Sequence, residues 1–233
     1  MSFRDATIEE VNTVVAKSAE AFNHYKKLDL KSRAKFLHGV ALELGANGTA
    51  LIAAAHRETN LSEARLVIEL KRTIFQLTSY ADACLEGTWL DIRIDTGNMG
   101  RNPPKPDLRK ILVPLGPVVV FGASNFPFAY STAGGDTACA LAAGCTVIIK
   151  AHPAHAQTSE LVAEAVQKAA KQHNLPENVF IHLHGGGFEV GKALVQHPLT
   201  KAVGFTGSFE GGKALFDLAN QREVPIPVFA EMG

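Results

Sequence analysis

The stretch PVVVFGASNFPFAYSTAGGDTACALAAGCTVIIK, residues 117–150, indicates which kind of fold the chain can adopt. It begins with an apolar, β-branched run, continues through a polar loop and an alanine-rich segment, and ends in a second β-branched run. Apolar β-branched runs are typical of buried strands, whereas alanine favours helix. The order of strand, helix and strand predicts a βαβ unit, whose two strands lie parallel in one sheet.

The same alternation continues to the end of the chain. Further buried strands are expected at 146–150, 179–183, 201–205 and 227–231, with helices at 132–143, 158–173, 190–197 and 208–220. Repeated alternation predicts an α/β fold, in which helices cover both faces of a Rossmann-like, doubly wound and mostly parallel sheet. Because such sheets bind ligands beyond the carboxyl ends of their strands, the candidate site comprises the loops at 121–127, 150–159, 184–191 and 205–212.

The chain before this region has a different character. Residues 1–86 are expected to be helical, with a capping box at Thr7 and Glu10. Further helices of this part are expected at 31–44, 48–58 and 62–85. Residues 87–116 are rich in Gly, Asn, Asp and Pro, which predicts a connecting segment with one short strand at 90–94. The sheet part then occupies residues 117–233.

The composition is that of an ordinary globular protein. Of 233 residues, 46% are hydrophobic, and 23 basic residues balance 23 acidic ones. A net charge of zero argues against a broad nucleic-acid or anionic-membrane surface, and the sequence has neither an apolar run of membrane-spanning length nor a signal-peptide pattern. Cys84, Cys139 and Cys145 have no metal-ligand spacing and form no disulfide framework. We therefore expect no metal, and a cytoplasmic location.

Two loops match most of a triphosphate-binding motif. Residues 207–213 have the spacing G-x-x-x-x-G-K, and residues 186–192 repeat it, so that the two motifs end in Lys213 and Lys192. The Ser or Thr that binds Mg²⁺ in this motif is replaced by alanine in both copies. The pattern therefore favours two ordinary strand–loop–helix turns, with each lysine on the outer face of its helix, over an ATP site.

Two further motifs are weaker. Residues 185–191 read GGGFEVG, which is one residue longer than the dinucleotide fingerprint and does not lie in the first βα unit. A tight glycine turn for strand–helix packing explains this run equally well. The HGGG at 184–187 is similar to an esterase oxyanion loop, but the chain contains no G-x-S-x-G nucleophile elbow, so we reject a serine hydrolase.

Five motifs, taken in order, point to a known family. They are PLGPVVVFGASNFP (114–127), the lysine of VIIK (150), HGGGFEVG (184–191), GFTGS (204–208) and FAEMG (229–233). Together they resemble the NAD(P)-dependent aldehyde dehydrogenases, and within them the branch that oxidises α-ketoglutarate semialdehyde (2,5-dioxopentanoate). The resemblance covers essentially the whole chain. It implies a coenzyme-binding domain for NADP or NAD, and an intact protein that oxidises a small aldehyde as a homo-oligomer.

The resemblance implies roles for single residues. Asn125 matches the oxyanion-hole asparagine, whose amide would stabilise the negative oxygen formed when a thiolate attacks the aldehyde. Glu231 matches the general base that activates water for thioester hydrolysis. Coenzyme contacts are expected from Phe121, Gly122, Ala123, Ser124, Lys150, His152, Pro153, Gly187, Gly191, Phe205, Thr206, Gly207 and Ser208.

Some of these positions carry more specific expectations. Lys150 matches the lysine that binds the adenosine ribose, and Gly207 with Ser208 match the pair that receives the pyrophosphate at a helix N-terminus. Pro153 stands where NAD-selective members often carry a glutamate, which would repel a 2′-phosphate. The sequence therefore favours NADP over NAD, although no arginine stands at the HGGG turn. Ser124 replaces a tryptophan that many members have.

The catalytic half of the family is not expected within these residues. The family's nucleophilic cysteine follows the FAEMG glutamate by some tens of residues, and Cys139 and Cys145 fit small buried packing residues instead. The resemblance thus implies a chain that binds coenzyme without oxidising aldehydes, and a segment at 107–114 that projects to another subunit. The alternative is a catalytically silent nucleotide-binding module, either a truncated paralogue or a P-loop-like ATP binder.

Overall fold

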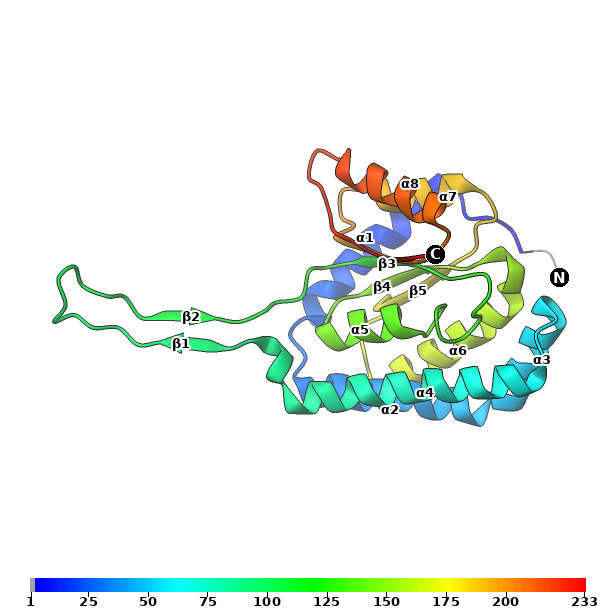
Figure 1. Cartoon of the computed structure of the whole chain (residues 1–233), viewed down its shortest axis with the longest axis horizontal. Helices are drawn as coiled ribbons and strands as arrows, with labels where there is room; N and C mark the ends of the chain where they lie inside the picture. Colours follow the sequence, from blue (N-terminus) through cyan, green and yellow to red (C-terminus); the bar gives the residue numbers. More distant parts are fainter. Residues whose placement is uncertain (1–2) are drawn as a thin grey trace.

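The computed structural model describes residues 3–233 and places a parallel sheet at the centre of the molecule (Figure 1). Its five strands lie in the order β5-β4-β3-β6-β7, and every neighbouring pair is parallel. The strands are β3 (Val118–Phe121), β4 (Val147–Lys150), β5 (Phe180–Leu183), β6 (Ala202–Gly207) and β7 (Val228–Met232). The predicted doubly wound α/β fold is confirmed.

Helices cover both faces of this sheet (Figure 1). One face carries α1 (Ile8–Tyr25), α7 (Phe188–Gln196) and α8 (Phe209–Asn220). The other carries α2 (Leu30–Ala46), α3 (Gly48–Thr59), α4 (Glu63–Glu86), α5 (Gly135–Ala143) and α6 (Ala156–Gln172). Side chains alternate between the two cores as the pleat requires: Val119 packs with the first group, whereas Val118 and Val120 pack with the second.

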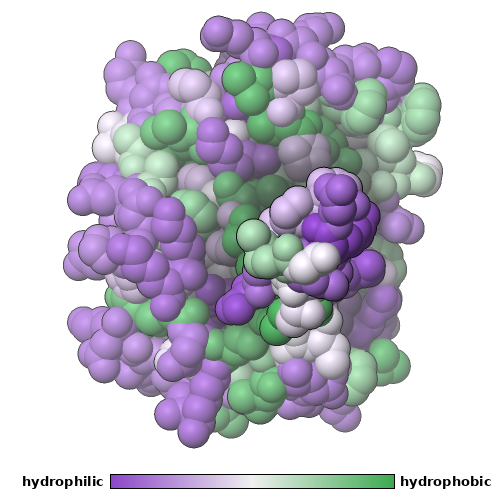
Figure 2. Space-filling view, turned by 90° about the vertical axis from the view of Figure 1, so that its left-hand side faces the viewer, coloured by the Kyte–Doolittle hydropathy of each residue, from purple (hydrophilic) through white to green (hydrophobic). Residues whose placement is uncertain are grey.

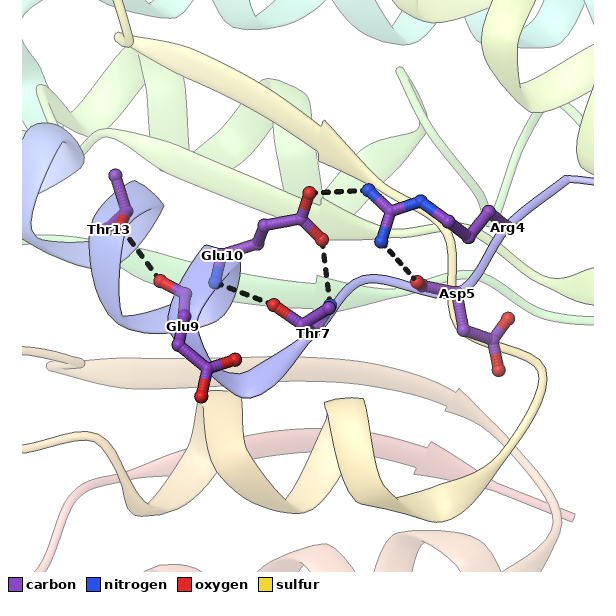
Figure 3. Close-up of polar contacts among 6 residues, drawn as sticks. All are labelled: Arg4, Asp5, Thr7, Glu9, Glu10 and Thr13. Carbon is purple, nitrogen blue, oxygen red and sulfur yellow. Dashed lines mark hydrogen bonds and ion pairs between the residues drawn. The ribbon is translucent and has the colours of Figure 1, made fainter.

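The first helix begins where the sequence predicts (Figure 3). Thr7 Oγ1 accepts the N–H of Glu10, and the Glu10 carboxylate accepts the N–H of Thr7, so the expected capping box is confirmed. The Arg4 guanidinium pairs with the same carboxylate at 2.5 Å. Asp5 accepts the N–H of Gly186 at 2.7 Å, which ties the start of the chain to the loop after β5.

The connecting segment forms a long arm that projects away from the sheet (Figure 1). Its two short strands, β1 (Arg93–Asp95) and β2 (Leu108–Lys110), pair antiparallel and are exposed throughout. The strand expected at 90–94 begins later, at Arg93. Before it, Thr88–Leu90 forms a 3-10 turn, η1, and Asp91 turns the chain with a φ of 46°. Asp91 is thus in the left-handed region, which interrupts any strand that starts before it.

Helix α5 begins at Gly135, three residues later than the sequence predicts. The N–H groups of Phe128 and Ala129 donate to the buried carboxylate of Glu69, which holds this stretch in turns. Gly134 then approaches the Ala129 carbonyl so closely that an added Cβ would lie 2.3 Å from its oxygen. A second expectation fails on the same helix, because Cys139 is exposed rather than buried.

Among residues 3–233, no single helix is both long and apolar enough to cross a membrane. Helices α2 and α3, which are bent by 70° relative to each other, meet the length and composition criteria only when they are taken together.

Candidate functional site

A cavity of about 510 Å³ opens beyond the carboxyl ends of the central strands. The strands β4 and β5 lie on one side of β3, whereas β6 and β7 lie on the other, so β3 and β6 flank the point where the strand order reverses. At such a point the connections leave in opposite directions and a crevice forms between them. The loops after β3, β4, β5 and β6 all contribute to this cavity.

Nearly all the expected coenzyme-contacting residues share this cavity. Those that line it are Phe121, Gly122, Ser124, Lys150, His152, Pro153, Gly187, Gly191, Phe205, Thr206, Gly207 and Ser208. Ala123 does not line it: its carbonyl accepts a hydrogen bond from His155 Nε2 at 2.8 Å, and its N–H donates to the Tyr130 carbonyl at 2.8 Å. The structure therefore gathers four loops as expected, and their role in coenzyme binding stays a prediction.

Two helix N-termini open into the cavity. Ser208 caps α8 by accepting the Gly211 N–H at 3.2 Å, as expected, and Gly187 occupies the N-cap of α7. Free backbone N–H groups and the helix dipole make such ends favourable for an anion. Nothing lies within 4 Å of the Cβ position of Gly187, whereas a Cβ on Gly191 would lie 3.0 Å from the Phe121 ring. The two glycines thus serve different needs, open approach at Gly187 and close packing at Gly191.

The charges at the cavity are positive. Lys150 and Lys192 line it, and none of the described residues that line it is acidic. Burial lowers the pKa of Lys150, against a smaller opposing effect of the Asp5 charge. Burial, then the charges of His155 and Lys150, lower the pKa of His152 to about 4, so this imidazole is neutral at pH 7. Its Nδ1 accepts the Ala154 N–H at 3.1 Å.

The position of Lys192 corrects one expectation and adds a residue. The sequence placed this lysine on the outer face of its helix, but Lys192 lines the cavity beside the Gly187 turn. Lys213, its counterpart in the second glycine motif, pairs with Asp217 at 2.6 Å along α8 and does not line the cavity. Gly191 packs closely against the Phe121 ring and the next residue, Lys192, faces the cavity, an orientation that a motif search cannot detect.

The two expected catalytic residues lie near the cavity without lining it. Asn125 is exposed in the loop directly after Ser124, which does line the cavity. Glu231 is exposed on β7, in register with Thr206 of β6. Asn125 thus follows the carboxyl end of β3, and Glu231 lies near the carboxyl end of β7, with β6 between the two strands. Their catalytic roles stay predictions.

Asp136, which the sequence analysis missed, is associated with Glu231. Its side chain packs under β6, where a Cβ on Gly204 would lie 3.3 Å from Asp136 Oδ2. Burial, and then the negative charge of Glu231, raise the pKa of Asp136. Its sequence signal was only a single acid in the first turn of a helix, which ordinarily marks favourable helix capping.

One further group of side chains has the composition of a metal site, although the sequence predicts none. Glu160, His182 and His184 bring their ligand atoms within 4.8 Å of one another. A hydrogen bond of 2.6 Å already joins His184 Nε2 to Glu160, and His182 Nε2 is hydrogen-bonded at 2.9 Å to Ser159 Oγ, outside the group. The group thus connects α6 to the end of the edge strand β5.

Comparison with known proteins identifies the family. Residues 1–233 match the aldehyde dehydrogenase family model throughout. The chain is 51% identical to alpha-ketoglutaric semialdehyde dehydrogenase 2 of Azospirillum brasilense and 46% identical to alpha-ketoglutaric semialdehyde dehydrogenase of Acinetobacter baylyi, in each case over 99% of this chain. It spans 44% of the length of each of these relatives.

Solved structures agree on the fold. A salicylaldehyde dehydrogenase from Pseudomonas putida G7 superimposes with a TM-score of 0.86 at 20% identity, covering 98% of this chain and 45% of that one. An NAD-dependent benzaldehyde dehydrogenase from Corynebacterium glutamicum gives 0.84 at 22% identity, covering 98% and 47%. At these identities the likeness shows the fold alone, whereas the family model covers every residue of the sequence. The chain belongs to the aldehyde dehydrogenase family, whose members are oxidoreductases.

Proposed function

We propose that residues 1–233 form the coenzyme-binding part of an aldehyde dehydrogenase and bind NADP, or NAD less tightly, in the cavity between β3 and β6. The observation that carries this proposal is the meeting of two helix N-termini and two lysines at the point where the strand order reverses. The family generally uses NAD(P), and the residues present fit a dinucleotide. Glycines leave room for close backbone approach, and cationic side chains face the cavity.

Single groups of this chain would hold the parts of the coenzyme. The backbone at Gly207 and the Ser208 hydroxyl would receive the pyrophosphate at the N-terminus of α8. Lys150 would bind the adenosine ribose, with Gly187 and Gly191 beside the adenine. The bound nicotinamide supplies the hydride acceptor for aldehyde oxidation.

The preference for NADP is argued from charge. Pro153 lines the cavity where a carboxylate would repel a 2′-phosphate, and Lys150 and Lys192 supply two cations to the same cavity. A phosphate that is bound by two lysines gains charge-assisted hydrogen bonds, which are stronger than those between neutral groups. Lys192 would thus supply, beside the HGGG turn, the phosphate-binding cation that no arginine supplies there.

In the intact protein, we propose that this part serves the oxidation of an aldehyde to a carboxylate, with α-ketoglutarate semialdehyde as the substrate. The two relatives of 46% and 51% identity carry that substrate in their names, which supports the choice. Asn125 would stabilise the oxyanion, and Glu231 would activate the hydrolytic water.

Neither Cys84 nor Cys145 can attack an aldehyde, because burial covers both thiols and raises their pKa. Exposed Cys139 lies on α5 and lines no part of the cavity.

The test is a calorimetric titration of the 233-residue chain with NADP⁺, NAD⁺ and Mg-ATP in parallel. Saturable binding of NADP⁺, weaker NAD⁺ and still weaker ATP are the expected results. Mg²⁺-dependent ATP binding would favour the catalytically silent nucleotide-binding module, and a folded chain that binds no dinucleotide would refute the proposal. An aldehyde added with NADP⁺ is expected to give no absorbance rise at 340 nm above the blank.

We also propose that the intact protein is cytoplasmic and assembles into a homo-oligomer. The exposed arm formed by β1 and β2 is the feature that supports oligomerisation, because it makes few contacts with its own sheet (Figure 1).

A further inference from the structure

Two arginines of α4 lie over the loop that carries Asn125. Arg65 Nη2 donates to the Asn125 carbonyl at 2.7 Å, and its guanidinium lies 4.9 Å from the centre of the Phe126 ring. Arg72 Nη2 donates to the Tyr130 hydroxyl at 2.5 Å, and its guanidinium lies 4.9 Å from the centre of that ring. The two rings pack edge to face at 5.2 Å. Two cations and two aromatic rings thus form one cluster.

The positive charge of this cluster is not neutralised by ion pairs within residues 3–233. Neither guanidinium belongs to any ion pair of the described chain. Glu69 lies between the two arginines along α4, but it is only 4% exposed, and its Oε1 accepts the N–H groups of Phe128 and Ala129 at 2.8 and 3.0 Å. One buried anion therefore faces the loop backbone, and two cations remain beside it.

Both guanidinia keep most of their hydrogen-bonding capacity. Each has five N–H donors, of which the structure uses one in each residue. Arg65 is partly exposed and Arg72 is exposed, so the remaining donors are open to a ligand. A guanidinium offers paired donors that match the two oxygens of a carboxylate, and stacking on an aromatic ring fixes its plane in advance.

The location of the cluster determines which carboxylate it could meet. Arg65 holds the main chain of Asn125, the residue whose amide would receive the aldehyde oxygen under the proposed function. A substrate with an aldehyde at one end and a carboxylate a few bonds away would bring its charged end toward α4. An uncharged aldehyde would leave these donors without a ligand.

We propose that Arg65 and Arg72 form a carboxylate-binding site that selects aldehydes bearing a distal acid group. This inference rests on the proposed function for the aldehyde end of the substrate, but not for the anion site itself. The anion site therefore has its own test in the chain as it stands.

The experiment follows the side-chain Nε–Hε resonances of the arginines in the ¹⁵N-labelled chain. The probe is 2-oxopentanoate, which has the carbon skeleton of 2,5-dioxopentanoate with a methyl group in place of the aldehyde, and 2-pentanone is its uncharged counterpart. At constant ionic strength, the resonances of Arg65 and Arg72 should shift saturably with the acid and stay in place with the ketone. Acetate added at the same concentration controls for general anion effects.

Two variants make the result specific. Arg72→Gln should weaken binding of the acid about tenfold or more, the loss expected for one charge-assisted pair. The matched control is Lys71→Gln, which removes a charge from the neighbouring exposed position and should leave the affinity unchanged. Arg65→Lys keeps the charge at the Asn125 loop but loses the paired donors, so it should weaken binding without unfolding the loop.

The site is refuted if the resonances do not shift, if acetate shifts them equally, or if Lys71→Gln weakens binding as much as Arg72→Gln. NADP⁺ titrated into the same sample separates the two proposals. A chain that binds NADP⁺ but not 2-oxopentanoate retains the coenzyme function and lacks the anion site, and the reverse result retains only the anion site.

Discussion

Lys192 and Lys213 stand at the same place in two repeats of one glycine pattern, yet their surroundings differ. Lys192 lines the cavity, whereas Lys213 pairs with Asp217 on the surface of α8. We predict that Lys192→Gln weakens NADP⁺ binding by about ten- to a hundredfold and leaves NAD⁺ binding unchanged, because a charge-assisted hydrogen bond to phosphate contributes roughly 1.5–3 kcal/mol. Calorimetry measures both affinities. Lys213→Gln is the matched control and should change neither, and equal losses for both coenzymes would contradict a contact with the 2′-phosphate.

A second residue-scale prediction concerns Gly134 at the start of α5. A Cβ there would lie 2.3 Å from the Ala129 carbonyl oxygen, and backbone cannot move aside as a flexible side chain can. We therefore expect Gly134→Ala to lower the free energy of unfolding by about 1–3 kcal/mol, as overpacking generally does. Urea unfolding followed by circular dichroism gives this value. Gly45→Ala in α2 serves as the control: the nearest atom to an added Cβ would be Ile74 Cδ1 of α4 at 3.9 Å, so the change should be neutral or stabilising.

At the scale of elements, the contact between β5 and α6 should make stability depend on pH. Burial, then the charge of His184, lower the pKa of His182 from 6.5 to about 4. Between pH 6.5 and about 4, His182 is therefore protonated in the unfolded chain but stays neutral in the folded chain. The contribution of neutral His182 to the free energy of unfolding is fully present above pH 6.5 and is lost as the pH falls toward 4. His182→Gln should flatten the fall in this window, and the same replacement at exposed His24 should not.

Some features of the helices and strands could be predicted from the sequence, and others could not. Local signals were enough for the capping box of α1, the Ser208 cap of α8 and the strands of the parallel sheet, because neighbouring residues determine each of them. The start of α5 was missed because Glu69, some sixty residues earlier, binds the N–H groups of Phe128 and Ala129 and holds the chain before the helix in turns. The side of α7 that faces the cavity was missed for a similar reason, since this side is defined by packing against residues far away in the sequence, such as Phe121 beside Gly191. Contacts distant in sequence leave no local pattern.

At the scale of the whole molecule, the arm is the part that the fold does not need. Every residue of β1 and β2 is exposed, and the arm rejoins the body through the hydrogen bond from Leu112 N–H to the Leu90 carbonyl at 2.9 Å. Viewed along the arm, hydrophobic surface lies around its base (Figure 2). The exposed apolar side chains of the returning segment are Ile111, Leu112, Val113 and Leu115. Such a patch is typical of a surface that takes part in an interaction.

The last prediction follows from this separation of arm and sheet. Replacing residues 93–110 with a short Gly-Ser turn should leave the melting temperature and the NADP⁺ affinity unchanged, because the cavity and both hydrophobic cores lie elsewhere. Self-association, measured by sedimentation equilibrium, should weaken, since the arm offers the unpaired edges of β1 and β2 to a partner. Val113→Lys, which keeps the arm and charges its base, should weaken association to a smaller degree. A shortened chain that associates as strongly as the original would show that the interface lies on another face, with exposed Phe216 of α8 as the next position to substitute.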